Sequence, residues 1–216
     1  MEFIPQLKWL WVSAIAAGLL AAAVKRGDLA TVDRGVAAWM ATIRSPSGDA
    51  AAKALTFFGS SPWMLVIIVG MGTWWILARR RSRIIAFTAA GSVGLLIEAC
   101  LRLWVGQWRP DTSLLSSVPD LLTRFEWAGF PSGHGFRSAF LYGWWAQALA
   151  QRKASLPAAS PKALWAMVGI VSCGMLIVAV GFTRVYLGRH WCSDILGAWL
   201  VALTALALAS AWSHRG

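Results

Sequence analysis

The chain has 216 residues, of which 58% are hydrophobic and only 13% are charged, and its mean hydropathy is +0.60. These values lie well beyond ordinary soluble usage and exclude a typical soluble domain. The formal net charge of +11 could suggest a nucleic-acid partner, but no basic stripe lies outside the apolar segments. We therefore assign the charge to juxtamembrane residues and expect no nucleic acid.

Apolar segments of about the length needed to cross a bilayer as helices recur along the chain. Six are predicted, at residues 7–24, 62–78, 84–105, 135–150, 163–182 and 195–212. Fifteen tryptophans fit a protein with aromatic belts at both membrane faces. The sequence thus predicts an all-α polytopic membrane protein with one domain over residues 1–216, built as a bundle of six transmembrane helices.

The N-terminal part contains the first predicted span and a polar connection. We expect the first span to be retained rather than cleaved as a signal peptide, because its apolar run is long for a signal peptide. In the connection at residues 27–61, four apolar residues recur at helical spacing: Val32, Val36, Trp39 and Ile43. This pattern predicts a short amphipathic helix that lies on the membrane surface.

Basic residues predict the orientation of the bundle. Six spans place both termini on one side, and the basic clusters at residues 79–83 and 152–162 fall on that side. The positive-inside rule makes this side cytoplasmic. The loop at residues 106–131 and the turn after the fifth span then both face outward.

The third predicted span ends in charged residues. Arg102 and Arg109 are seven residues apart, close to two helical turns, so both can point the same way about 10 Å apart along the axis. Two guanidinium groups so placed suit an anionic oxygen cluster such as phosphate. Glu98 precedes Arg102 by four residues and can pair with it on a helix. The alternative is a pair of arginines that only reach toward the membrane interface.

Ser132, Gly133 and His134 open the fourth predicted span. Ser132 is a natural N-cap residue, and Gly133 lets the backbone approach a ligand closely. The free N–H groups of a helix N-terminus can bind an anion, and His134 could act there as a proton donor. The alternative is an ordinary cap followed by an interfacial histidine.

A third stretch, from Thr183 to Asp194, lies between two long apolar runs and contains Arg184 and His190. If its end is helical, His190 and Asp194 lie on one face at positions i and i+4. The carboxylate can then accept one imidazole N–H and leave the other ring nitrogen free to attack. The alternative is a solvated loop with interfacial basic residues.

Together, these three stretches resemble the three signature motifs of the type 2 phosphatidic acid phosphatase superfamily, which also includes bacterial acid phosphatases and vanadium haloperoxidases. The resemblance covers residues 98 to 197, with the motifs in the family's order and spacing. Two positions depart from the family pattern: Arg102 replaces the usual lysine and Thr183 the usual serine. Arginine keeps the positive charge, and threonine keeps the hydroxyl.

The resemblance implies a role for each motif residue. His190 attacks phosphorus and forms a phosphohistidine, Asp194 orients its imidazole, and His134 protonates the leaving oxygen. The groups expected to hold the phosphoryl oxygens are Arg102, Arg109, Ser132, Gly133 and Arg184, with Thr183 in support. Glu98 is not part of the motifs, and we expect it either to aim Arg102 at the phosphate or only to neutralise that buried arginine. Because arginines would supply the charge that other phosphatases take from metals, we expect no metal and no other cofactor.

The expected function is hydrolysis of a lipid phosphate or diphosphate. The resemblance to bacterial members implies an inner-membrane protein with its active site facing the periplasm or the outside. Undecaprenyl diphosphate is the first expected substrate, and the alternatives are phosphatidate, phosphatidylglycerol phosphate and the phosphates of lipid A. A phosphotransferase would use the same residues. A non-catalytic transporter of anionic lipids would need the arginines but neither histidine, and the sequence does not fix the oligomeric state.

Overall fold

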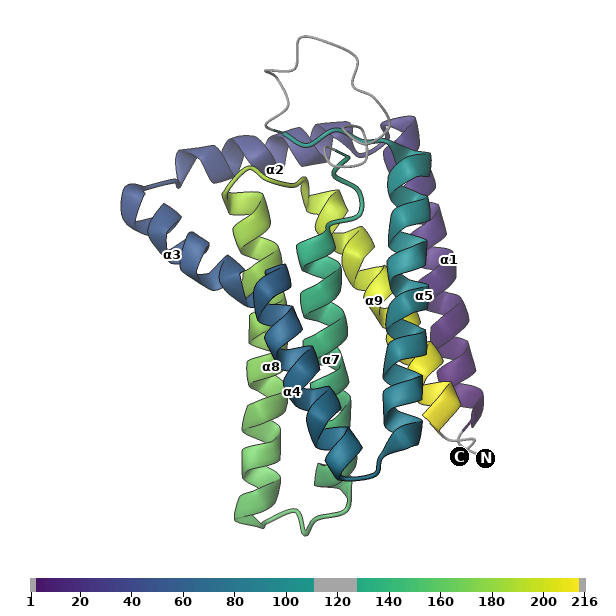
Figure 1. Ribbon diagram of the computed structural model, residues 1–216. Coiled ribbons are helices and arrows are strands. Elements are labelled where there is room, and N and C mark those ends of the chain that lie inside the picture. The colour runs from purple at the N-terminus through teal and green to yellow at the C-terminus, as the bar shows by residue number, and fades with distance from the viewer. Residues whose placement is uncertain (1–2, 111–127, 214–216) are drawn as a thin grey trace.

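A computed structural model describes residues 3–110 and 128–213, and the regular secondary structure of this part of the chain is helical apart from one isolated bridge between Trp108 and Ala128 (Figure 1). The helices are α1 (Phe3–Arg26), α2 (Ala30–Thr42), α3 (Pro46–Thr56), η1 (Phe57–Gly59), α4 (Ser61–Leu77), α5 (Arg81–Val105), α7 (Gly133–Ala154), α8 (Pro161–Tyr186) and α9 (Cys192–Ser213). The predicted all-α fold is confirmed.

Five stretches are long and apolar enough to cross a membrane. They comprise most of α1, a continuous stretch over Pro46–Leu77 that ends in α4, and then α5, α8 and α9. Two thirds of the apolar stretch of α9 is buried, 67% against at most 28% in the other four. This burial places α9 inside the bundle, while the other four present more of their surface to lipid.

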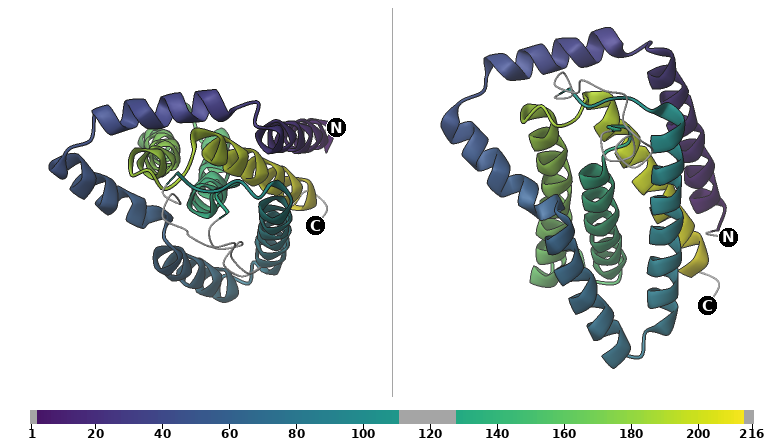
Figure 2. Two further views of the ribbon diagram at one scale, coloured as in Figure 1. Left: turned by 90° about the horizontal axis from the view of Figure 1, so that it is seen from above. Right: turned by 45° about the horizontal axis from the view of Figure 1, so that its top comes forward.

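The remaining predicted span corresponds to α7, which has 22 residues but is less apolar than the other five. Arg137, Gln147 and Arg152 lower its hydropathy. Most residues in its first half are buried, and it lies among α4, α5, α8 and α9 (Figure 2). A helix enclosed by other helices needs little lipid-facing apolar surface, which explains its composition. The count of six crossings stays a prediction.

Both termini lie at one end of the bundle. There α1 begins and α9 ends, and the α4–α5 and α7–α8 turns lie at the same end (Figure 1). Helix α2 crosses the opposite end. Serine N-caps start several helices: the Oγ atoms of Ser60, Ser132 and Ser160 each accept a backbone N–H at the start of α4, α7 and α8. These caps satisfy N–H groups that a helix start leaves without a partner.

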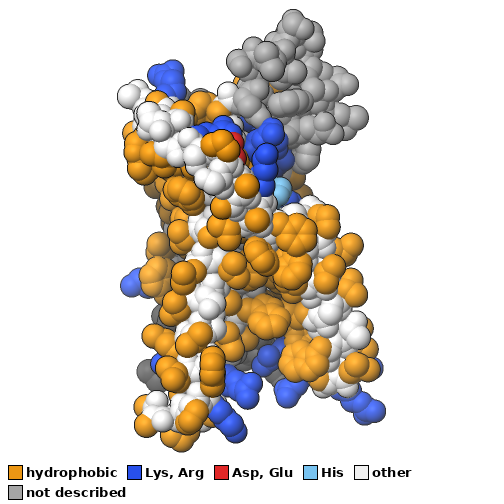
Figure 3. All heavy atoms as spheres, turned by 90° about the vertical axis from the view of Figure 1, so that its left-hand side faces the viewer, with side chains coloured by type: hydrophobic (Ala, Val, Ile, Leu, Met, Phe, Trp, Pro, Cys, Tyr) orange, Lys and Arg blue, Asp and Glu red, His pale blue; other side chains and the backbone are white. Residues whose placement is uncertain are grey.

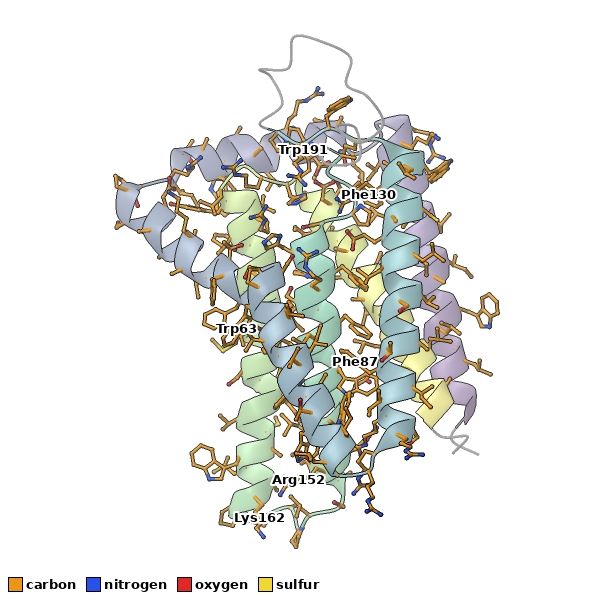
Figure 4. The ribbon with its side chains drawn as sticks, in the orientation of Figure 1. Trp63, Phe87, Phe130, Arg152, Lys162 and Trp191 are labelled. Carbon is orange, nitrogen blue, oxygen red and sulfur yellow. The ribbon has the colours of Figure 1, made fainter. Side chains whose placement is uncertain are left out.

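The core between α4, α5 and α7 is aromatic. The ring centroid of Phe87 lies 5.1 Å from those of both Phe140 and Trp144, and Trp75 lies 5.6 Å from Phe87. Figure 4 shows Phe87 in the middle of the bundle, away from both ends. Packing is close nearby, because a Cβ atom added at Gly94 would lie 2.5 Å from the ring of Phe136. Such contacts hold α5 tightly against α7.

The predicted amphipathic helix is α2, but its buried face differs from the predicted apolar stripe. Val32, Trp39 and Ile43 are exposed, whereas Met40 is buried and Val36 packs against the same cluster. The buried face also includes Asp33. The connection contains a second helix, α3, which the sequence did not separate and which Ser45 caps.

The surface has the pattern of a membrane protein. In Figure 3, hydrophobic side chains cover the middle of the molecule, and lysine and arginine side chains gather mainly toward its two ends. Exposed tryptophans such as Trp9, Trp74 and Trp165 contribute to the apolar surface. A broad exposed apolar surface of this kind is energetically favourable in contact with lipid and unfavourable in contact with water.

Candidate active site

The turn between α8 and α9 holds His190 beside Asp194. Gly188 adopts a φ of +67° in this turn, a left-handed conformation that glycine adopts without strain. The Nδ1 atom of His190 lies 3.0 Å from Oδ2 of Asp194, and the two side chains are 2% and 0% exposed. Because a carboxylate accepts, Nδ1 carries the proton and Nε2 keeps its lone pair. The i, i+4 pair predicted from the sequence is confirmed as a contact.

The surroundings of His190 favour a neutral imidazole. Burial, followed by the positive charges of Arg184, Arg109 and Arg102 and by His134, lowers the pKa of His190 well below its ordinary value. Desolvation and neighbouring cations both penalise the protonated ring. The ring is therefore neutral at pH 7, with a nitrogen lone pair available for attack on phosphorus.

The start of α7 is tied directly to this turn. The backbone N–H of Ser132 donates to the carbonyl oxygen of Asp194 at 3.1 Å. The Oγ of Ser132 accepts the N–H of Gly135 at 3.3 Å, so Ser132 is the N-cap that the sequence predicts. Both Ser132 and Gly133 are buried. The N-terminus of α7 and its partial positive charge thus lie at the same end of the bundle as His190.

His134 is partly buried in the first turn of α7. The guanidinium group of Arg137, one turn further along, lies 3.4 Å from His134 Nδ1. An arginine can only donate, so His134 accepts through Nδ1 when it makes this contact. Its Nε2 then carries the proton of the neutral ring.

The end of α5 contributes a buried ion pair. Arg102 Nη2 donates to Glu98 Oε1 at 2.6 Å and to the carbonyl oxygen of Pro131 at 3.1 Å. A Cβ atom added at Gly133 would lie 3.0 Å from Arg137 Nη1 and 3.1 Å from Glu98 Oε1. The predicted pairing of Glu98 with Arg102 is confirmed, and the pair packs against the second motif.

The other predicted residues lie around the same centre. Arg184, near the end of α8, and Arg109, in the α5–α7 connection, are close enough for their charges to act on His190. Thr183 is 1% exposed, and its hydroxyl donates to Val180 O within α8 at 2.8 Å. Its proton is therefore used inside the helix. Trp191 and Phe130 mark this end of the bundle in Figure 4, and Arg152 and Lys162 mark the other.

Two charged residues next to this centre were missed by the sequence prediction. Asp33 of α2 is 2% exposed and accepts hydrogen bonds from Ser193. The sequence did offer a signal for Asp33, because it is an acidic residue in helical register with Val36, which is partly buried, and Met40, which is buried. Arg137 could have been found as a lone charge inside the fourth apolar run, one turn after His134.

The arrangement can support phosphoryl transfer. A free imidazole nitrogen, a second histidine, three arginines and a helix N-terminus meet at one end of the bundle, and positive charge of this kind stabilises the equatorial oxygens of a transferring phosphoryl group. Over residues 3–110 and 128–213, no group of three His, Cys, Asp or Glu side chains is arranged to hold a metal ion.

Comparison with known proteins identifies the family of the chain. The family model described as PAP2 superfamily matches residues 82–216. Phosphatidylglycerophosphatase B of Bacillus subtilis (strain 168) is 27% identical over 197 residues, which cover 91% of each chain. The crystal structure described as the first transmembrane PAP2 type phosphatidylglycerolphosphate phosphatase, also from Bacillus subtilis, has the same fold. The two structures match with a TM-score of 0.75 and 23% sequence identity, and the match covers 95% of this chain and 96% of the other. Because the family match spans more than half of the chain and includes all three motifs, the chain belongs to the PAP2 superfamily and is an integral membrane phosphatase.

Proposed function

We propose that this phosphatase hydrolyses the phosphate of a membrane lipid through a phosphohistidine formed at His190. The observation that carries the proposal is the buried contact of 3.0 Å between His190 Nδ1 and Asp194 Oδ2. That contact leaves Nε2 as the nucleophile and lets the carboxylate stabilise the positive ring that forms during attack.

The reaction has two steps. Without substrate, burial and the charges of Arg184, Arg137 and Arg109 lower the pKa of His134 to about 3, and the negative charge of the bound phosphate would raise that pKa so that the ring becomes protonated. Nε2 of His190 forms a bond to phosphorus while the bond from phosphorus to the lipid oxygen breaks, and this protonated His134 gives its proton to that oxygen. Water then attacks the phosphohistidine and loses a proton to His134, which releases inorganic phosphate and restores both histidines. Arg102, Arg109 and Arg184 would hold the phosphoryl oxygens in both steps, together with Ser132 and Gly133. Glu98 would fix Arg102.

A cavity beside the site supports a lipid substrate. About 250 Å³ lies between α4, α5 and α7, and the lining is mainly apolar, with Ile68, Phe87 and Leu95 among its residues. Arg137, which contacts His134, also lines it. An apolar cavity this close to His134 suits an acyl or prenyl chain rather than a soluble phosphate ester.

Phosphatidylglycerol phosphate is the substrate that we propose first. The support is the name of the Bacillus subtilis relative, which aligns with 91% of this chain. Undecaprenyl diphosphate, the first expectation from the sequence, would fit the same residues and belongs in the same assay. Phosphatidate, the phosphates of lipid A and transfer of the phosphoryl group to a second lipid are tested in that assay too.

We place the enzyme in a bacterial inner membrane with its active site outside the cytoplasm. The support is the position of the basic residues at 79–83 and 152–162, which lie in the turns opposite the site end (Figure 4). Basic residues prefer cytoplasmic turns.

The test is phosphate release from a panel of lipid phosphates by the purified protein, with a chelator present. We expect release from at least one lipid phosphate and none from the His190→Ala variant at matched protein concentration. A transporter would bind these lipids without releasing phosphate. Binding without release across the whole panel would contradict the proposal, and loss of release with chelator would contradict the expectation of metal independence.

A further inference from the structure

Asp33 lies on α2, outside the three signature motifs, yet its carboxylate bonds to the segment that carries His190 and Asp194. It accepts the N–H of Ser193 at 3.0 Å and the hydroxyl of Ser193 at 2.6 Å. The thiol of Cys192 donates to it at 3.0 Å. Helix α2 packs across the ends of α8 and α9, which brings the carboxylate to this turn (Figure 2).

Asp33 also reaches the connection that carries Arg109. Gln107 Nε2 lies 3.4 Å from Asp33 Oδ2, and the carbonyl oxygen of Gln107 accepts the N–H of Gly129 at 2.6 Å. The α5–α7 connection and the α8–α9 turn are therefore joined through one side chain. A second hydrogen bond joins the same two segments: Trp191 Nε1 donates to the carbonyl oxygen of Trp108 at 2.7 Å.

These contacts give the buried carboxylate a specific task. A carboxylate that is 2% exposed costs free energy unless several donors compensate its lost hydration. Here three donors come from the first turn of α9 and a fourth from Gln107. The N-terminal N–H groups and dipole of α9 also favour negative charge. Asp33 thus caps α9 from a different helix, while Asp194 makes its own contacts to His190 and Trp191 in the same turn.

We propose that Asp33 is a positioning residue for the reaction: it fixes the first turn of α9 through Ser193 and so holds Asp194 and His190 in the geometry of attack. The hydrogen bonds of Asp33 go to Ser193, Cys192 and Gln107 and not to His190 or Asp194, and a carboxylate would repel an anionic phosphoryl group rather than bind it. Its removal should therefore lower turnover more than substrate binding. This inference rests on the proposed phosphatase function.

The first test compares two substitutions. Asp33→Ala removes the acceptor, and we expect kcat to fall roughly 10- to 100-fold, the cost of misplacing a reacting group by about 1 Å, with KM little changed. Asp33→Asn keeps an oxygen for the N–H of Ser193, and its amide can donate to the serine hydroxyl. We expect Asp33→Asn to retain most of the kcat. A purely structural role would lower Tm without this split between kcat and KM.

The matched control is Ser13→Ala. It removes a buried hydrogen bond of 3.0 Å between Thr204 of α9 and Ser13 of α1, away from the active site. We expect it to lower Tm without lowering kcat. If Ser13→Ala lowers kcat as much as Asp33→Ala at equal Tm, general destabilisation explains both, and the proposal is wrong.

A double-mutant cycle tests the route of action. If Asp33 acts through Ser193, the single variant Ser193→Ala should have a lower kcat than the wild type. The double variant Asp33→Ala/Ser193→Ala should then have the same kcat as Asp33→Ala. Additive losses would overturn this route. Should Asp33→Ala fail to fold, Ser193→Ala carries the test: a lower kcat with KM and Tm little changed supports the route, and wild-type kcat overturns it.

Hydrogen exchange separates this inference from the proposed function. Backbone amides at residues 187–194 should exchange faster in Asp33→Ala than in Ser13→Ala, whether or not a substrate has been found. Equal exchange would overturn the positioning role. Full activity of Asp33→Ala beside an inactive His190→Ala would reject this inference and leave the proposed function intact, whereas full activity of His190→Ala would reject the proposed function.

Discussion

At the scale of single residues, the charges around His190 determine its protonation state. The ring is almost fully buried, and three arginines contribute to the low pKa of His190. Asp194 acts in the opposite sense through the contact at Nδ1. The site thus keeps the imidazole neutral before substrate binds. Asp194 can then stabilise the ring when attack makes it positive.

This balance predicts a specific dependence on pH. Removing the charge of Arg184 should raise the pKa of His190, so that protonation inactivates more of the enzyme at a given acidic pH. The acidic limb of kcat/KM should therefore move to higher pH in Arg184→Gln than in the wild type, in addition to an overall loss of rate. The substrate ionises identically in both profiles, so their difference reports on the enzyme. An acidic limb at unchanged pH would contradict this assignment.

At the scale of helices, short motifs were easier to predict than packing faces. The Glu98–Arg102 pair followed from i, i+4 spacing because both residues lie in α5. The His190–Asp194 contact was predicted from the same spacing, but His190 lies in the turn before α9, so it is this turn that brings His190 to Asp194. The buried face of α2 could not be predicted in this way. Val32, Trp39 and Ile43 are apolar but exposed, because a membrane protein is surrounded partly by lipid. Hydrophobic periodicity then no longer separates the core face from the membrane face, so the burial of Asp33 was missed.

We predict that the lipid chain binds in the cavity between α4, α5 and α7. A Cβ atom at Gly91 would already lie 3.1 Å from the ring of Phe140, so Gly91→Trp should fill much of the adjacent cavity. We expect kcat/KM for a long-chain lipid phosphate to fall roughly tenfold or more, a loss of about 1.4 kcal/mol. Hydrolysis of a short soluble aryl phosphate should be retained.

The control for this substitution is Gly72→Trp on α4, where an added Cβ atom would meet nothing within 4 Å. It should leave both activities close to those of the wild type. Equal losses on the lipid and on the aryl phosphate in Gly91→Trp would instead show damage to the catalytic groups, and the cavity would lose its proposed role.

At the scale of the whole molecule, alternation of apolar and basic segments predicted the arrangement well. Both termini and the basic turns lie at one end, and the three motifs lie at the other (Figure 1). Long apolar runs specify this topology almost regardless of packing detail. The number of crossings was harder to predict, because α7 carries Arg137 and other polar residues that its neighbours enclose.

The orientation is tested by cysteine labelling in spheroplasts. Thr42→Cys places a thiol at the site end and Ser82→Cys at the basic end, and both native residues are exposed. The background replaces Cys100 and Cys173 by alanine and Cys192 by serine, which keeps a donor to Asp33. An impermeant maleimide should label Thr42→Cys directly and Ser82→Cys only after permeabilisation. The reverse pattern would place the active site in the cytoplasm.

The most direct test of the central claim is to trap the phosphorylated enzyme. A lipid phosphate that carries labelled phosphorus is mixed with purified protein, the reaction is stopped by rapid denaturation at alkaline pH, and the labelled peptide is mapped. We expect the label on His190, none in His190→Ala, and more label in a His134→Ala variant tested with an aryl phosphate, whose leaving group needs little protonation. Label on any other residue, or wild-type turnover by His190→Ala, would contradict the mechanism.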